Sequence, residues 1–476
     1  MIDEDLPQYK EGEKSDHTQE KGLDEIEEDP QYEKMAPLEE EMQIIFQKLH
    51  EQDEKLIYEA LCDLYDVTKD FQYDYPADFL EKLLELLSIQ NEKLHNELIY
   101  VLINAIKHEN DTALYLKENG LFDYIEDQFP SLYATKLLLY LFKKFDEIKF
   151  HIMGTELKNK LIESLSQTDD DIHFSYLADI CAQLVAKKIT KEVTIDTDEI
   201  IEIFDHLLEA FLRIPREDEN AVISFANAFS FYIDSNKLFL DIFLRKDLID
   251  LFIHYPCDNP KYVENVLLMA SSIARNSEEC AKYLEARHAM EFCEHYLDSD
   301  NKFVLADAFH VLTELLIYIP ELCNHYVSSQ IIHKAVSIFR DDSTSILVQK
   351  AILRLSVYII NYMPSAGFHL VEESGLYNIL FENCPLTDPK DSFFVIYAIL
   401  RLFQEGYDIK YSEHGHTCDH CHDNDHECEE DKNEEEKNEI NVDLIEWLED
   451  QRGKGSEKTE LIIEELIKTL KHEQPI

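Results

Sequence analysis

The chain has 476 residues, of which 44 are Lys or Arg and 99 are Asp or Glu, so its formal net charge is −55. A surface this acidic repels DNA and RNA backbones, which argues against direct nucleic acid binding. It either attracts basic partners or simply keeps the protein soluble. Only 10 residues are Gly and 13 are Pro, too few turn residues for a sheet-rich fold, so the composition predicts helices joined by short polar loops.

No apolar run approaches the roughly 20 residues needed to cross a membrane; the longest candidate is 137–142. The acidic N-terminus lacks the basic start and apolar stretch of a secretory signal. Seven cysteines are scattered through the predicted helices, as expected of small buried residues in a reducing compartment. These features predict a soluble cytoplasmic or nuclear protein without membrane insertion.

Residues 1–38 are rich in carboxylates, Lys, Gln and Pro and poor in apolar residues, which predicts a disordered acidic tail. From residue 39 to about residue 410, apolar residues recur at helical spacing, as in 79–87 and 331–339. This long region is the predicted folded body of the protein.

The helical pattern of the body repeats with a period of roughly 40 residues, the period of armadillo and HEAT units. The centres of its long apolar segments lie near Ala60, Val101, Leu138, Asp179, Phe225, Leu267, Leu312, Leu353 and Ile399. A second signal is independent of this spacing: the segment 118–122, Glu-Asn-Gly-Leu-Phe, matches 373–377, Glu-Ser-Gly-Leu-Tyr. Gly120 and Gly375 therefore occupy one repeated turn between two helices.

The stretch from Leu84 to Ile125 resembles an armadillo repeat. Residues 84–88 resemble the end of a second helix, 98–106 a long third helix, and 114–120 the short first helix of the next unit. The resemblance covers about 40–407 and implies an all-α, right-handed α-solenoid of about eight to nine armadillo/HEAT-like repeats, with a disordered acidic tail and a C-terminal helical cap. The alternative is a non-repetitive helical bundle.

In armadillo proteins the third helices line a concave groove that holds an extended peptide or a partner helix, and most members are scaffolds or adaptors. The importin-alpha transport adaptors bind basic, nuclear-signal-like peptides there with Trp and Asn four residues apart, a spacing that puts both on one helix face. Tyr100 and Asn104 stand at these places in one repeat, and His310 and Glu314 in a later one. These four residues are the predicted partner-binding residues, with ordinary helix packing as the alternative for Tyr100 and Asn104.

Residues 411–440 form a His/Cys-rich and acidic insert that is predicted to be largely disordered. Cys418 and Cys421 make a C-x-x-C pair, whose spacing lets two thiolates hold one tetrahedral ion. The candidate metal ligands are Cys418, Cys421, Cys428, His416, His420 and His426. Thiolate and imidazole together favour Zn, with Cu or Ni as alternatives. The competing interpretation is a compositionally biased loop that holds no metal, in which case the protein has no cofactor.

Two amphipathic helices are predicted in 441–476, separated by Gly453 and Gly455. They either cap the open end of the solenoid, as solenoid ends require, or detach to occupy a groove. The sequence has no phosphate-binding loop, zincin motif or nucleophile elbow. It therefore predicts a non-enzymatic, monomeric scaffold or adaptor that binds a partner protein or an extended peptide. The alternative is a divergent import adaptor for basic cargo.

Overall fold

The computed structural model is built from helices, and no strand occurs in the part of the chain that it describes. The described residues are 39–69, 73–108, 110–145, 148, 152–153, 155–185, 197–213, 219–235, 237–329, 331–341, 343–383, 391–405, 444–454 and 457–472. Two compact units divide the chain, Met1–Lys246 (unit 1) and Asp247–Ile476 (unit 2).

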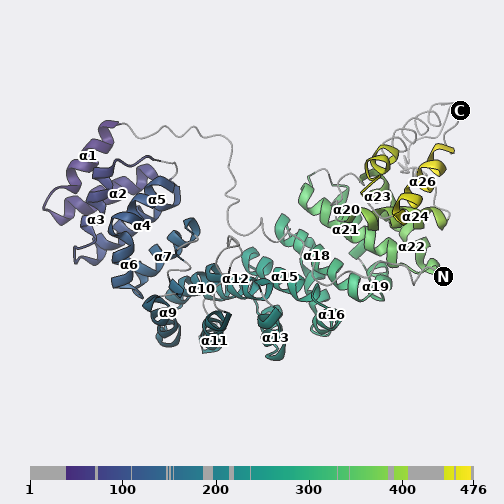
Figure 1. The fold of residues 1–476 in the computed structure, drawn as a ribbon, viewed down its shortest axis with the longest axis horizontal. Coiled ribbons are helices and arrows are strands. Elements are labelled where there is room, and N and C mark those ends of the chain that lie inside the picture. The colour runs from purple at the N-terminus through teal and green to yellow at the C-terminus, as the bar shows by residue number, and fades with distance from the viewer. Residues whose placement is uncertain are drawn as a thin grey trace, which may run out of the picture. The chain divides into compact units, whose positions relative to one another are not determined.

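Unit 1 is a stack of long helices, each packed on the next along the chain (Figure 1). The long helices are α2 (Glu54–Thr68), α4 (Glu92–His108), α7 (Leu132–Lys144), α10 (Asp171–Val185) and α12 (Glu219–Ser235). The shorter helices are α1 (Glu39–Leu49), α3 (Ala77–Leu86), α5 (Asn110–Leu116), η2 (Lys117–Leu121), α6 (Phe122–Gln128), α9 (Glu156–Gln167) and α13 (Lys237–Arg245). A further long helix, α11 (Thr197–Arg213), packs on α9.

Unit 2 repeats the same arrangement. Its long helices are α15 (Pro260–Ala274), α18 (Lys302–Tyr318), α21 (Ile346–Tyr362) and α24 (Ser392–Gln404). Between them lie α14 (Ile249–Ile253), α16 (Glu278–Glu285), α17 (Ala289–His295), η3 (Tyr296–Asp298), α19 (Leu322–Ser328), α20 (Ile331–Phe339), η4 (Ser365–Gly367), α22 (Phe368–Ser374) and α23 (Leu376–Asn383).

Every one of the nine predicted repeat centres falls within one of these long packed helices, from Ala60 in α2 to Ile399 in α24. The predicted all-α repeat fold is therefore confirmed. The core lies between successive repeats, since fully buried aromatic side chains such as Phe204, Phe229 and Tyr262 come from these layers. Each repeat buries its apolar face against its neighbours, as in other solenoids.

Local sequence sets where the long helices begin. Asp53, Ser131 and Asn301 each precede a long helix, and the side-chain oxygen of each accepts a hydrogen bond from a backbone N–H of the first turn. Asn259 does the same for α15, whose first residue is Pro260. Proline suits that position because its missing N–H would have no partner inside the helix.

The turn that precedes the second short helix of a repeat adopts a left-handed backbone at four places. Gly120 (φ +111°) and Gly375 (φ +72°) occupy two of them, as the sequence match predicts. Asp247 (φ +56°) and His288 (φ +63°) occupy the corresponding turns before α14 and α17. Asp and His tolerate this region better than most residues with a side chain, which explains how these two turns form without glycine.

The C-terminal helix α26 (Glu457–His472) packs on α24. Ile463, Leu466 and Leu470 are buried on it, and Lys471 Nζ lies 3.1 Å from Glu449 Oε1 on the preceding helical segment 444–450. Within unit 2 these residues lie in the position of a cap. No helix among the described residues has the length and apolar character to cross a membrane. The predicted tail 1–38 and the insert 411–440 lie outside the described residues.

Candidate functional site

Four tyrosines lie on the long helices of unit 1, one on each of α2, α4, α7 and α10. They are Tyr65, Tyr100, Tyr140 and Tyr176, and we call them the tyrosine face. Tyr100 is the most exposed, at 39%, and its ring centre lies 6.2 Å from that of Tyr65. Because α2, α4, α7 and α10 pack in order, side chains from residues up to 111 positions apart (176 − 65) share one surface.

Lys136 of α7 lies between two of these rings. Its ammonium nitrogen is 5.3 Å from the ring centre of Tyr100 and 5.3 Å from that of Tyr176. A cation over an aromatic face is attracted by the negative charge of the π system. Lys136 as a residue is only 8% exposed, which is unusual for lysine. Lys136 therefore links the rings of Tyr100 and Tyr176.

The hydroxyls of the tyrosine face make no hydrogen bond to any other described residue. Burial raises the pKa of Tyr140, and the nearby Asp179 carboxylate raises it further. Burial also raises the pKa of Tyr176, with smaller contributions from Tyr140, Tyr100 and Asp179. At neutral pH the hydroxyls of Tyr140 and Tyr176 therefore stay protonated and can donate hydrogen bonds to a ligand.

Of the predicted partner-binding residues in unit 1, Tyr100 lies on this face and Asn104 lies beneath it. Asn104 is 7% exposed, and its amide donates a hydrogen bond of 2.9 Å to Thr68 Oγ1 on α2. Tyr75 also donates to Thr68 Oγ1, at 3.1 Å, and Thr68 donates to the Leu64 carbonyl oxygen. The Asn104 side chain is thus engaged in joining two repeats.

In unit 2 the predicted pair His310 and Glu314 lies on α18. Glu314 is 6% exposed, and its Oε1 lies 2.9 Å from Arg354 Nη1 on α21. Arg354 Nε lies 3.3 Å from Asp391 Oδ2 at the start of α24. Burial lowers the pKa of Arg354, but Glu314 and Asp391 outweigh it and leave the pKa above its usual value. This three-residue ion network spans three repeats and neutralises the buried charges.

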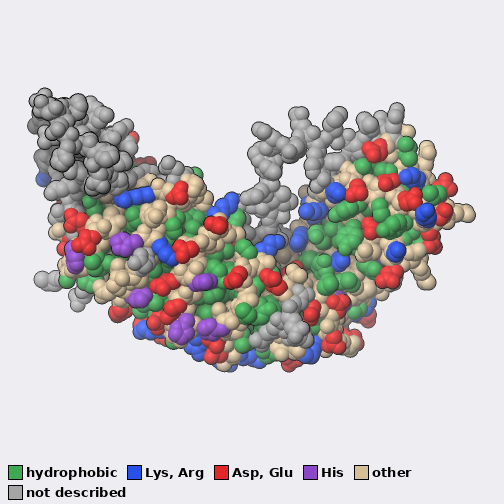
Figure 2. All heavy atoms as spheres, turned by 180° about the vertical axis from the view of Figure 1, so that it is seen from behind, with side chains coloured by type: hydrophobic (Ala, Val, Ile, Leu, Met, Phe, Trp, Pro, Cys, Tyr) green, Lys and Arg blue, Asp and Glu red, His purple; other side chains and the backbone are tan. Residues whose placement is uncertain are grey.

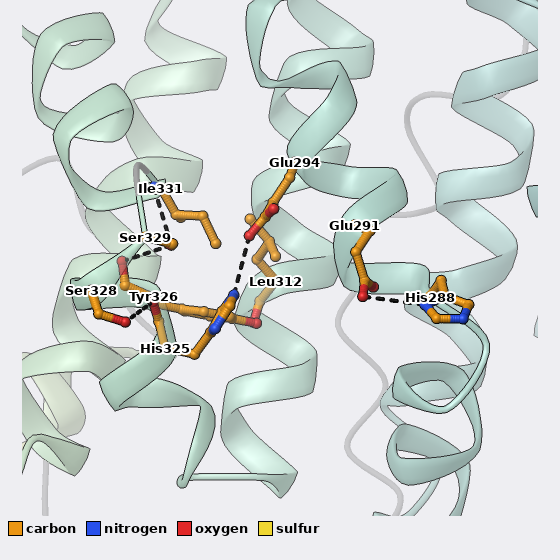
Figure 3. Close-up of polar contacts among 9 residues, drawn as sticks. All are labelled: His288, Glu291, Glu294, Leu312, His325, Tyr326, Ser328, Ser329 and Ile331. Atoms are coloured by element: carbon orange, nitrogen blue, oxygen red, sulfur yellow. Dashed lines mark hydrogen bonds and ion pairs between the residues drawn. The ribbon is translucent and has the colours of Figure 1, made fainter.

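A second surface is rich in histidine. Figure 2 shows histidine side chains gathered on one face of unit 2, and its exposed histidines lie on or next to the short helices. They are His254, His288, His295, His325, His333 and His369, which we call the histidine surface. In Figure 3, His325 Nε2 lies 3.4 Å from Glu294 Oε1 of the previous repeat, and His288 Nδ1 lies 3.2 Å from Glu291 Oε1.

Three open hollows lie beside the short helices. One of about 510 Å³ in unit 1 lies beside Gly120 and contains His95, whose Nε2 is 2.6 Å from Tyr124 Oη. Another of about 610 Å³ in unit 2 lies between Arg340 and Ser374, and a third of about 420 Å³ lies beside Glu294. Two of the three lie next to the repeated glycine turns, so they are a feature of the repeat rather than of one site.

Within the described residues, no three His, Cys, Asp or Glu side chains are placed to hold a metal ion. The predicted metal ligands Cys418, Cys421, Cys428, His416, His420 and His426 lie outside the described residues. Zinc binding by the insert therefore stays a prediction.

Sequence reasoning found Tyr100 but missed Lys136, Tyr140 and Tyr176. Lys136 directly precedes the apolar run 137–142, and a lysine at such a place is a sign of an unusual environment. Tyr176 follows Lys136 by 40 residues, which is one repeat period. Tyrosine and lysine residues that recur one repeat period apart would have indicated the tyrosine face, whereas a search for Trp and Asn finds only Tyr100 and Asn104.

No protein-family model matches the chain, and no curated protein matches it in sequence. Among solved structures, an engineered protein of the Northeast Structural Genomics Consortium aligns over 90% of this chain and 99% of its own, with a TM-score of 0.57 and 15% identity. A designed armadillo repeat protein aligns over 57% of this chain and 98% of its own, with a TM-score of 0.31 and 14% identity. At such identity, the first similarity bears on the fold alone. The fold defines this chain as an all-α helical repeat protein.

Proposed function

We propose that this protein is a non-enzymatic scaffold that holds a segment of a partner protein on the tyrosine face of unit 1. The observation that carries the proposal is a row of partly exposed tyrosines on four consecutive long helices. Tyrosine offers a large contact area, loses little conformational entropy on binding and keeps a polar hydroxyl, so it is enriched where proteins bind one another. A stack of repeats suits an extended segment, because each repeat adds one contact.

The armadillo resemblance of the sequence supports the same use of the long helices, with a binding segment that lies across them. The alternative, an import adaptor for basic cargo, draws support from the acidic composition and from Tyr100. Lys136 weighs against it, since this lysine already lies between the rings of Tyr100 and Tyr176, where a cargo lysine would go.

The proposal is tested by affinity purification of the tagged full chain and quantification of the proteins that copurify. Tyr100→Asp with Tyr176→Asp places two charges on the tyrosine face. The matched control, Leu114→Asp with Leu212→Asp, places two charges on exposed leucines of α5 and α11, which are 39% and 51% exposed.

We expect the first variant to lose its main partners at least ten-fold and the control to retain them. Far-UV circular dichroism must show that both variants keep the helical content of the wild type. If both variants retain the same partners as the wild type, the tyrosine face is not the binding surface.

A further inference from the structure

Lys136 is a buried cation for which the described residues supply no carboxylate. The residue as a whole is 8% exposed and takes part in no ion pair with them, although the chain contains 99 acidic residues. We propose that the ammonium of Lys136 is the docking point for a carboxylate of an acidic partner segment. This inference rests on the proposed function, because it names the chemistry of the segment that the tyrosine face receives.

Two other shielded cations of this protein have acidic partners. Lys158, whose side chain is 15% exposed, lies 3.2 Å from Glu199 Oε1 and 3.2 Å from Glu202 Oε2. Arg354, whose side chain is 18% exposed, lies between Glu314 and Asp391. Removing a charge from water is costly unless an opposite charge or hydrogen bonds replace the water. Lys136 is more buried than either residue and has only the two tyrosine rings, so an incoming anion would supply the missing partner.

The groups around Lys136 suit a carboxylate. The hydroxyls of Tyr65, Tyr100, Tyr140 and Tyr176 are not hydrogen-bonded to other described residues, so they can donate to carboxylate oxygens. The rings of Tyr100 and Tyr176 lie on either side of the ammonium and limit its contact with water. In such surroundings a hydrogen-bonded ion pair is stronger than one at the open surface. Asp179 lies near Tyr140 and Tyr176, but no described carboxylate forms an ion pair with Lys136.

A basic segment suits the same place less well. A second ammonium close to Lys136 would be repelled, because two like charges that are shielded from water repel each other more strongly than in bulk water. The net charge of −55 repels an acidic segment at long range, but salt screens that repulsion beyond about 10 Å at 0.1 M. The buried contact is screened much less. Binding of an acidic segment should therefore be measured at raised salt, where the local contact decides the affinity.

The test uses three fluorescein-labelled peptides, Ser-Tyr-Ser-X-Ser-Tyr-Ser, in which X is Glu, Gln or Lys. Their binding to the full chain is measured by fluorescence anisotropy in 0.3 M NaCl. We expect the Glu peptide to bind at least ten-fold more tightly than the Gln peptide. Lys136→Met should abolish this preference, whereas Lys136→Arg should keep most of it.

The matched control is Lys107→Met, which removes the same charge from an exposed position at the end of α4. It should keep the preference for Glu. Equal affinity for the Glu and Gln peptides, a preference that survives Lys136→Met, or no binding of the Glu peptide would each overturn the inference. If the peptides bind equally while Tyr100→Asp with Tyr176→Asp still removes the cellular partners, the proposed function stands and the acidic ligand does not.

Discussion

The ammonium of Lys136 lies 5.3 Å from the ring centre of Tyr100, and the two residues come from neighbouring repeats. The protein thus fills the space between two of its own tyrosines with its own cation. In a protein with such an excess of acidic residues, this lysine is the basis of our proposal that this part of the surface receives an anion rather than a cation. Unit 2 differs, because there the shielded cation Arg354 is neutralised by Glu314 and Asp391.

Replacing Asn104 by Ala should lower the free energy of unfolding by about 1–2 kcal/mol. The amide of Asn104 donates to Thr68 Oγ1, a buried oxygen that joins α2 and α4. Tyr100→Phe, one helical turn earlier on the same face, should change the stability little, since its hydroxyl has no hydrogen bond to a described residue. Urea unfolding followed by circular dichroism measures both. Equal stability of Asn104→Ala and the wild type would show that the amide is available for a ligand instead.

The network of Glu314, Arg354 and Asp391 should behave as one unit. Arg354→Met leaves two carboxylates close together and should lower the free energy of unfolding by about 3 kcal/mol, and Glu314→Gln should lower it by about 2 kcal/mol. The double variant should be less destabilised than the sum by about 1–2 kcal/mol, because contacting residues are coupled. Glu278→Gln, which removes an exposed pair with Lys282, is the control and should have little effect. Additive effects in the double-mutant cycle would contradict the network.

The left-handed turn at Gly375 should tolerate Asn better than Ala. A Cβ at this position would lie 2.8 Å from Arg340 Nη2, the mobile end of a long side chain, so the steric conflict is easily relieved. The backbone conformation at φ +72° then sets most of the cost, about 1 kcal/mol for Ala and less for Asn. Thermal unfolding of Gly375→Ala and Gly375→Asn measures the difference. A larger loss for Asn would mean that contact with Arg340, and not the backbone, decides the residue.

Tyr75 should make the stability fall above pH 10. Burial raises the pKa of Tyr75 in the folded protein to about 12, although hydrogen bonds with Thr68 and Asn104 oppose the shift. The unfolded chain titrates near pH 10, so it releases its proton first as the pH rises. The contribution of protonated Tyr75 to the free energy of unfolding is complete below pH 10. It is lost between pH 10 and 12, at up to about 1.4 kcal/mol per pH unit. Tyr75→Phe should lack the fall in stability that is due to Tyr75, as urea unfolding at pH 9 and pH 11 would reveal. If the stability of the variant and of the wild type depended on pH identically, Tyr75 would not be the cause.

The repeat architecture was predictable because it is encoded locally. The period of roughly 40 residues and the spacing of apolar residues place nine of the long helices, although not α11. The matched segments around Gly120 and Gly375 predict two of the left-handed turns. The other two turns, at Asp247 and His288, could not be recognised from glycine in the sequence. Asp and His adopt the same left-handed backbone there, although glycine adopts it more readily.

The site was only partly predictable. A helix-face argument finds Tyr100 and Asn104 together, because residues four apart share a face. Which of them faces a ligand depends on the neighbouring helix, where Thr68 draws Asn104 into the interior. Glu314 is a similar case, since its partner Arg354 is 40 residues away on the next long helix.

The sequence by itself therefore determined that this chain is a stack of helical repeats. The spacing of apolar residues sets each helix locally and recurs in every repeat, and the scarcity of glycine disfavours a sheet-rich fold. Only the tertiary structure decided that Lys136 lies between Tyr100 and Tyr176, and that Arg354 neutralises Glu314 and Asp391. Such contacts join residues that are one repeat or more apart in the sequence. Their energy depends on how deeply the charges are buried, and the order of charged residues in the sequence does not reveal this.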